Sequence, residues 1–364
     1  LRVTADFEGK IKNDLIQVED IQDSVESILI QSGYSDVAKA YILYRKQREK
    51  IRNMKSTILD YKELVDSYVK ATDWRVKENS TVTYSVGGLI LNNSGAITAN
   101  YWLSEIYDEE IANAHRSGDI HLHDLSMLTG YCAGWSLKQL ILEGLGGVPG
   151  KITSKPAKHL ASLCNQMVNF LGIMQNEWAG AQAFSSFDTY LAPFVKVDHL
   201  SYDEVKKCVE SFVYGVNTPS RWGTQAPFSN ITLDWVVPSD LAQQPAIIGG
   251  QPQDFTYGDC QKEMDLVNKA FIEIMIEGDA NGRGFQYPIP TYSITKDFDW
   301  SDTENNKLLF EMTSKYGTPY FSNYVNSDMQ PSDVRSMCCR LRLDLRELRR
   351  KSGGFFGSGE STGS

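Results

Sequence analysis

Cysteine and histidine are scarce in this sequence, which has only six cysteines and five histidines in 364 residues. The cysteines show no regular spacing of the kind that frames a disulfide-rich secreted fold, so a reducing, cytoplasmic location is expected. No apolar run reaches about 18 residues, which argues against a membrane-spanning helix. The sequence starts with neither an initiator methionine nor an apolar signal region, and we therefore expect an excerpt of a longer polypeptide.

Basic residues are fewer than acidic ones: 36 lysines and arginines stand against 46 aspartates and glutamates, which gives a formal net charge of −10. Non-specific nucleic-acid binding needs a basic surface, so this balance argues against a nucleic-acid partner. It still allows a local site for a single nucleotide. The length is sufficient for one large core with a small appendage, or for two domains.

The first 55 residues show helical periodicity, and we expect them to form a helical appendage. Apolar residues recur on one face of a first helix, before a glycine stop at Gly33: Ile21, Val25, Ile28 and Leu29. Ser35 can cap a second helix. The basic run at 44–50 in that helix is typical of a solvated helix face rather than of a binding patch.

Helical and extended patterns alternate from residue 156 onward, which predicts a mixed α/β architecture. Amphipathic helices are expected at 156–175 and 201–216, the second opened by a capping box of Ser201 and Glu204. Cys164 and Cys208 fall on the apolar faces of these helices, and we expect both to be packed in the core. Strands are expected at residues 230–237, 285–295 and 319–326.

Two adjacent cysteines, Cys338 and Cys339, stand out in a chain that has so few. Neighbouring side chains of a strand point to opposite faces, so one thiol can face a cavity while the other packs. Leucines alternate with charged residues from 340 to 345, which predicts a strand directly after the pair. Two buried, unreactive thiols are the alternative interpretation of the same pattern.

A histidine pair lies in the segment 118–125. On a strand, His121 and His123 would project to the same side, either as metal ligands or as a hydrogen-bonding pair that lines a cavity. An H-x-H strand also begins the barrels of metal-dependent hydrolases. A metal site would need His159 and His199 to complete it, and both lie in or beside expected helices, so we expect no metal here.

Glycines mark two further segments. Cys132 lies between Gly130 and Gly134, and such small surroundings permit the close approach of another backbone or of a ligand. The tail at 352–364 is rich in glycine and serine, which predicts a flexible linker. A glycine-lined loop around a phosphate is the functional alternative for this tail.

Several of these motifs occur in a specific order along the chain: residues 18–48, 118–125, Cys132, residues 218–228 and 288–292, and the pair Cys339–Arg340. Together they resemble the anaerobic (class III) ribonucleoside-triphosphate reductases, which are glycyl radical enzymes. The first segment resembles the last part of an ATP-cone regulatory domain, without the front that holds the nucleotide phosphates, so we expect no ATP binding of the full-module kind. Residues 1–55 are expected to be this ATP-cone part, and residues 56–364 the N-terminal part of the catalytic barrel.

The resemblance implies a ten-stranded α/β barrel, entered by a finger loop with a cysteine at its tip. It implies the reduction of ribonucleoside triphosphates to deoxyribonucleotides, with formate as reductant. By this likeness, Cys339 takes the place of the thiyl radical residue that abstracts the 3′ hydrogen of the ribose. Cys132 matches the cysteine on the opposite side of the substrate, which helps to reduce C2′. His121, His123 and Asp124 would orient substrate or formate.

The same resemblance implies cofactors and partners. A radical-SAM activating enzyme would generate the glycyl radical, deoxynucleotides and ATP would be allosteric effectors, and a homodimer is expected. The glycyl radical residue and a four-cysteine structural zinc site belong to the C-terminal part of the family enzyme, which this sequence does not include. The fragment alone is therefore expected to be inactive. Cys338 departs from the family, where glycine often stands at that position.

Two other functions remain open from the sequence. A glycyl radical acyltransferase of the pyruvate formate-lyase type also uses adjacent cysteines in a barrel loop. The ATP-cone segment and the separate Cys132 favour the reductase over that enzyme. A non-catalytic fragment that senses nucleotides or mediates dimerisation is the second alternative.

Overall fold

The structure of the protein is a computed structural model that describes residues 2–11, 15–59, 61–70, 84–146, 152–219, 225–328, 334–336, 342–344 and 362–363. The chain forms two compact units, residues 1–72 and residues 73–364. Within the described ranges, no helix is long and apolar enough to cross a membrane.

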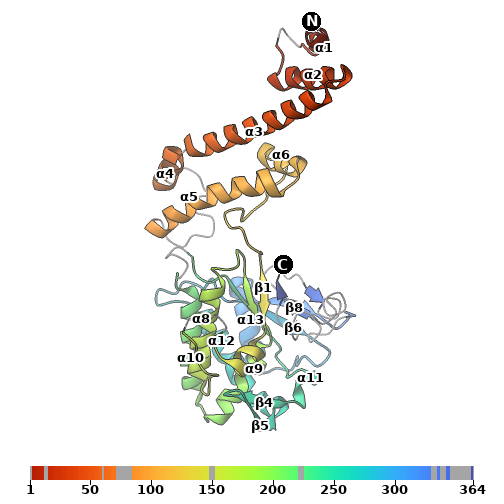
Figure 1. Cartoon of the computed structure of the whole chain (residues 1–364). Helices are drawn as coiled ribbons and strands as arrows, with labels where there is room; N and C mark the ends of the chain where they lie inside the picture. The colour runs from red at the N-terminus through yellow and green to blue at the C-terminus, as the bar shows by residue number, and fades with distance from the viewer. Residues whose placement is uncertain are drawn as a thin grey trace. The chain divides into compact units, whose positions relative to one another are not determined.

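The first unit is built from helices in its described part (Figure 1): α1 (Arg2–Glu8), α2 (Val18–Gln31), α3 (Ser35–Leu59) and α4 (Tyr61–Lys70). Gly33, with a φ of 81°, follows the end of α2, which confirms the predicted stop. In α3, the Arg45 guanidinium donates to Gln22 at 2.8 Å and to Asp23 at 2.9 Å, and it also pairs with Glu26. The prediction of a solvated basic face is therefore wrong for Arg45, which ties α3 to α2.

The second unit is organised around a six-stranded sheet with the order β10-β1-β2-β3-β6-β7. Its strands are β1 (Ala133–Trp135), β2 (Gln182–Phe184), β3 (Ser229–Leu233), β6 (Ile289–Ile294), β7 (Tyr320–Asn323) and β10 (Thr362–Gly363). In this sheet, the neighbouring strands β1, β2, β3, β6 and β7 are parallel to one another, and β10 is antiparallel to β1. The predicted mixed α/β fold is confirmed. The strands that the structure describes make an open sheet and do not close the expected ten-stranded barrel.

Two antiparallel hairpins accompany the sheet. Strand β4 (Pro245–Ile248) pairs with β5 (Gln251–Thr256), and β8 (Val334–Ser336) pairs with β9 (Arg342–Asp344). Strand β9 falls within the alternating leucine pattern that follows the cysteine pair, so the strand predicted there is confirmed for these three residues.

Helices that contribute to one apolar core cover one face of the sheet: α7 (Leu137–Glu143), α8 (Leu160–Met174), α9 (Phe187–Val197), α10 (Tyr202–Asn217), α12 (Gln261–Glu277) and α13 (Glu304–Tyr316). The short helix α11 (Ser239–Ala242) packs instead against the 3-10 turn η3 (Tyr257–Cys260). Figure 1 shows α8, α10 and α12 packed beside one another. The capping box of Ser201 and Glu204 opens α10 as predicted. Cys164 is buried and Cys208 is half-buried against the same core, which confirms their predicted packing.

Three helical elements precede the first strand of the sheet along the chain: α5 (Val86–Tyr101), the π-helical turn η2 (Trp102–Ile106) and α6 (Glu109–Ser117). The strand predicted around 118–125 is wrong, because Gly118 ends α6 with a φ of 85°. The amides of Gly118 and Asp119 donate back to the carbonyl oxygens of His115 and Ala114, as in a Schellman cap. Residues 119–131 therefore form a loop between α6 and the sheet.

Candidate functional site

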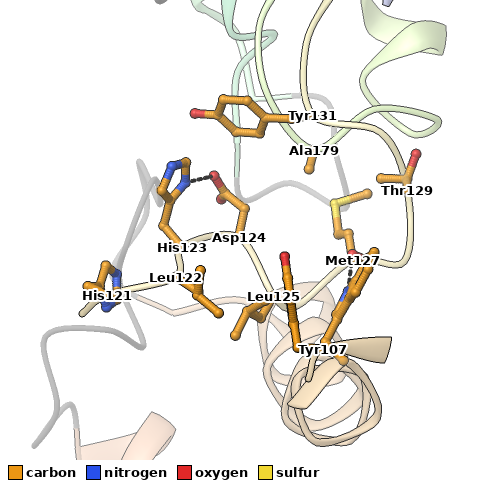
Figure 2. Close-up of a pocket in the computed structure, with 11 residues that line it drawn as sticks. Tyr107, His121, Leu122, His123, Asp124, Leu125, Met127, Thr129, Tyr131 and Ala179 are labelled. Carbon is orange, nitrogen blue, oxygen red and sulfur yellow. Dashed lines mark hydrogen bonds and ion pairs between the residues drawn. The ribbon is translucent and has the colours of Figure 1, made fainter. Parts of the chain in front are cut away.

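A pocket of about 400 Å³ is formed around the loop 121–131 (Figure 2). The loop contributes most of the wall, and the rest comes from the turn η2 with the residue that follows it and from the segment before β2. Its lining residues are Trp102, Tyr107, His121, Leu122, His123, Asp124, Leu125, Met127, Thr129, Tyr131 and Ala179. The pocket thus includes the three polar residues that the sequence singles out in this segment.

His123 and Asp124 form the polar centre of the pocket wall. The Nδ1 atom of His123 lies 2.6 Å from Oδ2 of Asp124, and the imidazole meets the Tyr131 ring edge-on at a centroid distance of 5.0 Å. A carboxylate accepts hydrogen bonds, so Nδ1 carries the proton and Nε2 is left as the acceptor of the neutral ring. The His123 side chain is 51% exposed and that of Asp124 is 20% exposed. The imidazole is therefore held in one tautomer and remains accessible.

The backbone supports this arrangement at Asp124. Its φ of 57° lies in the left-handed region, which is unusual for a residue with a side chain. Aspartate is among the residues that tolerate this region, and the conformation turns the chain directly after His123. Asp124 is thus both the turn residue of the loop and the partner of the imidazole.

His121 does not form a pair with His123. Its ring packs against the ring of His115 on α6 at a centroid distance of 5.7 Å, and His115 Nδ1 accepts from the amide of Leu122 at 3.1 Å. Figure 2 shows the His121 ring apart from the His123–Asp124 contact. The predicted same-side projection is wrong because these residues lie in a loop and not in a strand.

The described residues contain no group of three histidine, cysteine or acidic side chains arranged to hold a metal ion. His159 lies near Asp198, with its Nδ1 atom 3.0 Å from Oδ2 of that carboxylate, and His199 has a φ of 49° after α9. Neither histidine lines the pocket. The absence of a metal ion at His121 and His123 stays a prediction.

Cys132 follows the pocket residue Tyr131 and is completely buried. Its Sγ atom accepts a hydrogen bond from the amide of Ala181 at 3.2 Å. A Cβ atom at Gly180 would lie only 2.7 Å from this sulfur. The expected close approach of another backbone to Cys132 is confirmed, and Gly180 makes it possible.

Cys338, Cys339 and Arg340 lie outside the described residues, in the segment that joins β8 to β9. The expected approach of Cys339 and Cys132 to one cavity therefore stays a prediction. The structure brings together His123, Asp124 and the chain just before Cys132. It adds lining residues that sequence patterns do not mark, because η2 and the segment before β2 reach the pocket only through the tertiary fold.

Comparison with known proteins agrees with this architecture. The family model for anaerobic ribonucleoside-triphosphate reductase matches residues 78–364, and the model for the ATP cone domain matches residues 1–50. The anaerobic ribonucleoside-triphosphate reductase of Haemophilus influenzae is 24% identical over 239 residues, which cover 58% of this chain and 33% of that protein. The Escherichia coli enzyme of the same name is 22% identical over 240 residues, with the same coverage of 58% and 33%.

A crystal structure of the anaerobic ribonucleotide reductase from Thermotoga maritima, in complex with dATP and CTP, shares the fold with a TM-score of 0.54 and 20% identity. The match covers 78% of this chain and 50% of that one. The alignments with the two curated relatives span about a third of their length. The reductase family model extends over most of the chain, and the motifs occur in the order noted in the sequence. The chain therefore belongs to the anaerobic ribonucleoside-triphosphate reductase family, with an ATP-cone segment at its N-terminal end.

Proposed function

We propose that the protein takes part in the anaerobic reduction of ribonucleoside triphosphates to deoxyribonucleoside triphosphates by radical chemistry. The observation that carries the proposal is the connection between the pocket and Cys132. Tyr131 lines the pocket beside His123, and Cys132 is the next residue. On the other side, Ala179 lines the pocket, and a Cβ atom on the following Gly180 would lie 2.7 Å from the Cys132 sulfur. The Thermotoga maritima relative holds dATP and CTP, which supports a nucleotide as the ligand.

In this proposal, two thiols act on opposite faces of the ribose. Cys339 removes the 3′ hydrogen atom as a thiyl radical and becomes a thiol, which returns a hydrogen atom to C3′ at the end of the cycle and becomes the thiyl radical again. Cys132 supplies a hydrogen atom to C2′ after the 2′-hydroxyl group has left as water. Formate, which is oxidised to carbon dioxide, supplies the hydrogen and the electrons that restore the Cys132 thiol and complete the reduction. The burial of Cys132 suits this role, since radical steps need a site from which water is excluded. The Ala181 amide holds its sulfur in one position.

His123 and Asp124 are proposed to orient the substrate or formate. With Nδ1 bound to the Asp124 carboxylate, the opposite nitrogen can accept a hydrogen bond from a ribose hydroxyl group. After protonation the same nitrogen would donate to a carboxylate such as formate. We place His121 in a lesser role, at the edge of the pocket, because its ring packs against His115.

The remaining cofactors and partners follow from the family and are part of the proposal. A glycyl radical, held outside this chain and generated by a radical-SAM activating enzyme, would supply the oxidising equivalent that converts the Cys339 thiol to its radical. ATP and deoxynucleotides would regulate a cytoplasmic homodimer. A structural zinc ion is expected only outside this chain. Residues 1–55 would be the ATP-cone part and residues 56–364 the barrel part.

The test is an anaerobic assay of deoxynucleotide formation by the protein, with the glycyl radical segment of the family added in trans and an activating enzyme present. Replacement of either proposed catalytic thiol, by Cys132→Ser or Cys339→Ser, should abolish product. The matched control is Cys208→Ser, at a half-buried cysteine on α10, which should retain activity.

Other results would favour another function. Coenzyme A-dependent cleavage of pyruvate would point to an acyltransferase. Nucleotide binding without turnover, although electron paramagnetic resonance detects a glycyl radical, would indicate a non-catalytic fragment. Full activity of Cys132→Ser would contradict the role proposed for that thiol.

A further inference from the structure

The two faces of the parallel sheet differ in character. Phe184, Ile231 and Tyr292 belong to the apolar core beneath the helices. Side chains alternate along a strand, so the neighbouring positions point to the opposite face. That face carries buried polar residues on three adjacent strands, β3, β6 and β7: Asn230, Thr232, Thr291, Ser293 and Ser322. The described strands of the sheet contain no lysine, arginine, aspartate or glutamate.

Two of these residues have polar atoms without a hydrogen-bond partner among the residues that the structure describes. Asn230 is 0% exposed, and neither Nδ2 nor Oδ1 of its amide has a partner in that part of the chain. Thr291 is 1% exposed, and its Oγ1 atom is likewise unpaired. Thr232, by contrast, accepts from the amide of Ser186 at 3.0 Å. A buried donor or acceptor without a hydrogen bond lowers the stability of the folded protein. We therefore expect the unpaired atoms of Asn230 and Thr291 to bind a group that the described residues do not supply.

The register places this pair on the same face as Cys132. Cys132, Ala181 and Phe228 pack together, and each directly precedes its strand, β1, β2 or β3, so the register of these strands extends to them as one row. Asn230 belongs to the next row, in which Gly134 and Ala183 present only a hydrogen atom and a methyl group. From strand geometry, the Cα atoms of Asn230 and Thr291 lie about 8 Å apart, and those of Cys132 and Asn230 about 12 Å apart.

We propose that Asn230 and Thr291 bind the nucleoside part of the substrate, and not its phosphates. A phosphate only accepts hydrogen bonds, so it would leave the amide oxygen of Asn230 unpaired, and the described strands of the six-stranded sheet carry no lysine or arginine that could balance its charge. Sugar hydroxyl groups and base edges both donate and accept, and they are neutral. This inference rests on the proposed function and assigns it two positioning residues.

The test compares binding with stability in single variants. Binding of CTP, cytidine and inorganic tripolyphosphate is measured by isothermal titration calorimetry, and the melting temperature is measured without ligand. Thr291→Val and Asn230→Leu keep the approximate shape of each side chain and remove its polar atoms. Each should weaken CTP and cytidine binding by about 2- to 10-fold, the range expected for loss of a hydrogen bond. Tripolyphosphate binding should not change.

The stability measurement separates a binding role from a structural one. A hydroxyl group that is unpaired without ligand destabilises the ligand-free protein, so Thr291→Val should leave the melting temperature equal or higher. Ser229→Ala is the matched control. Its hydroxyl group is also buried and unpaired, but its position alternates onto the helix-covered face, so nucleotide binding should be unchanged.

Three outcomes would overturn the inference: unchanged CTP binding in Thr291→Val, a lower melting temperature with unchanged binding, or a loss of tripolyphosphate binding equal to that of CTP. Thr291→Val remains informative if Asn230→Leu does not fold. Failure of the wild-type protein to bind any ribonucleotide would instead contradict the proposed function. Comparison of cytidine with 2′-deoxycytidine and with the free base then tells sugar recognition from base recognition.

Discussion

At the scale of single residues, contacts around Cys132 are set by the absence of a side chain at Gly180. An added Cβ atom would lie 2.7 Å from the Cys132 sulfur and 2.8 Å from both the ring and the carbonyl oxygen of Tyr131. These distances are shorter than real Cβ contacts, and one of the three neighbours is backbone. The position of the Cys132 thiol therefore depends on Gly180, a residue without a side chain that could take part in catalysis.

Gly180→Ala should lower the free energy of unfolding by about 1–3 kcal/mol, the usual cost of overpacking a buried site. It should also reduce deoxynucleotide formation, because the Cys132 sulfur must shift. Denaturant unfolding and the anaerobic assay measure the two effects. Gly9→Ala is the control, since nothing lies within 4 Å of the added methyl group there. Unaltered stability and activity in Gly180→Ala would show that the site can relax around the methyl group.

Two buried carboxyl groups form another contact that depends on individual atoms. Asp188 accepts hydrogen bonds from the amides of Thr189, Asp234 and Trp235 and from the side chain of Asn268, at 2.9–3.0 Å. Asp234 accepts from the Thr189 hydroxyl group at 2.6 Å. Burial raises the pKa of both groups, and the nearby Asp188 carboxylate raises the pKa of Asp234 further. The four donors around Asp188 favour its charged form over that of Asp234, so we assign the charge to Asp188 and the proton to Asp234.

This pair predicts a pH dependence of stability. The folded protein keeps a proton on Asp234 that the unfolded chain releases above pH about 4, so stability should fall as the pH rises from about 4 to about 8. The slope from this group is at most about 1.4 kcal/mol per pH unit. Asp234→Asn keeps an acceptor for Thr189 and should flatten the profile. Chemical unfolding at a series of pH values measures it, and an identical slope in the variant would contradict the assignment.

At the scale of elements, helix α10 is held at its start and along its side. Ser201 and Glu204 exchange hydrogen bonds at the N-terminus. The Tyr202 hydroxyl group donates to Glu273 on α12 at 2.5 Å, and Lys206 lies 3.0 Å from the same carboxylate. The pKa of Tyr202 is raised by burial and by this carboxylate, so the phenol keeps the proton that it donates. α10 and α12 are thus coupled through Glu273.

The capping box should contribute measurably to the stability of α10. Ser201→Ala is expected to lower the free energy of unfolding by about 1 kcal/mol, because an amide at the helix start loses its acceptor. Ser201→Thr is the matched control, because it keeps a hydroxyl group that can accept from the Glu204 amide, and it should retain most of this stability. Equal losses in the two variants would indicate that the hydroxyl group is not the stabilising feature. Thermal or denaturant unfolding distinguishes the two cases.

At the scale of the whole molecule, regulation is expected to involve surfaces away from the proposed cysteines. The family suggests an effector site near a helical subunit interface, and α8 and α10 are long amphipathic helices. Their apolar residues are also used to cover the sheet, among them Leu163 and Val209. The interface therefore needs a direct test.

We predict that the protein is a homodimer that a deoxynucleoside triphosphate stabilises. At a hundredfold excess over its dissociation constant, the effector should add roughly 2.7 kcal/mol to the free energy of unfolding. Thermal melting with each of the four deoxynucleotides and light scattering for mass provide the measurements. The melting shift should persist in Cys339→Ala, since we expect the effector site to be separate from the proposed catalytic thiol. A monomer without any shift would remove both the interface and the regulatory site.

Local sequence signals determined much of this protein. Apolar periodicity and a capping box predict α8 and α10, and the alternating pattern after Cys339 predicts β9, because these features depend on residues only a few positions apart. Short motifs in a fixed order are sufficient to indicate the family. The sequence around Gly118 predicts a strand at 118–125, but Gly118 ends helix α6 and a loop follows. A glycine before an extended-looking segment can equally end a helix.

Only the tertiary structure decided which distant residues meet. The tail at 352–364, for which composition predicts a linker, contains Thr362 and Gly363, which pair with β1. His123 meets Asp124 and Tyr131 through a loop conformation that alternation does not encode. Asn230 and Thr291 share a face because β3 and β6 pair across more than fifty residues of intervening chain. Strand pairing and burial depend on the whole fold, and no local pattern carries that information.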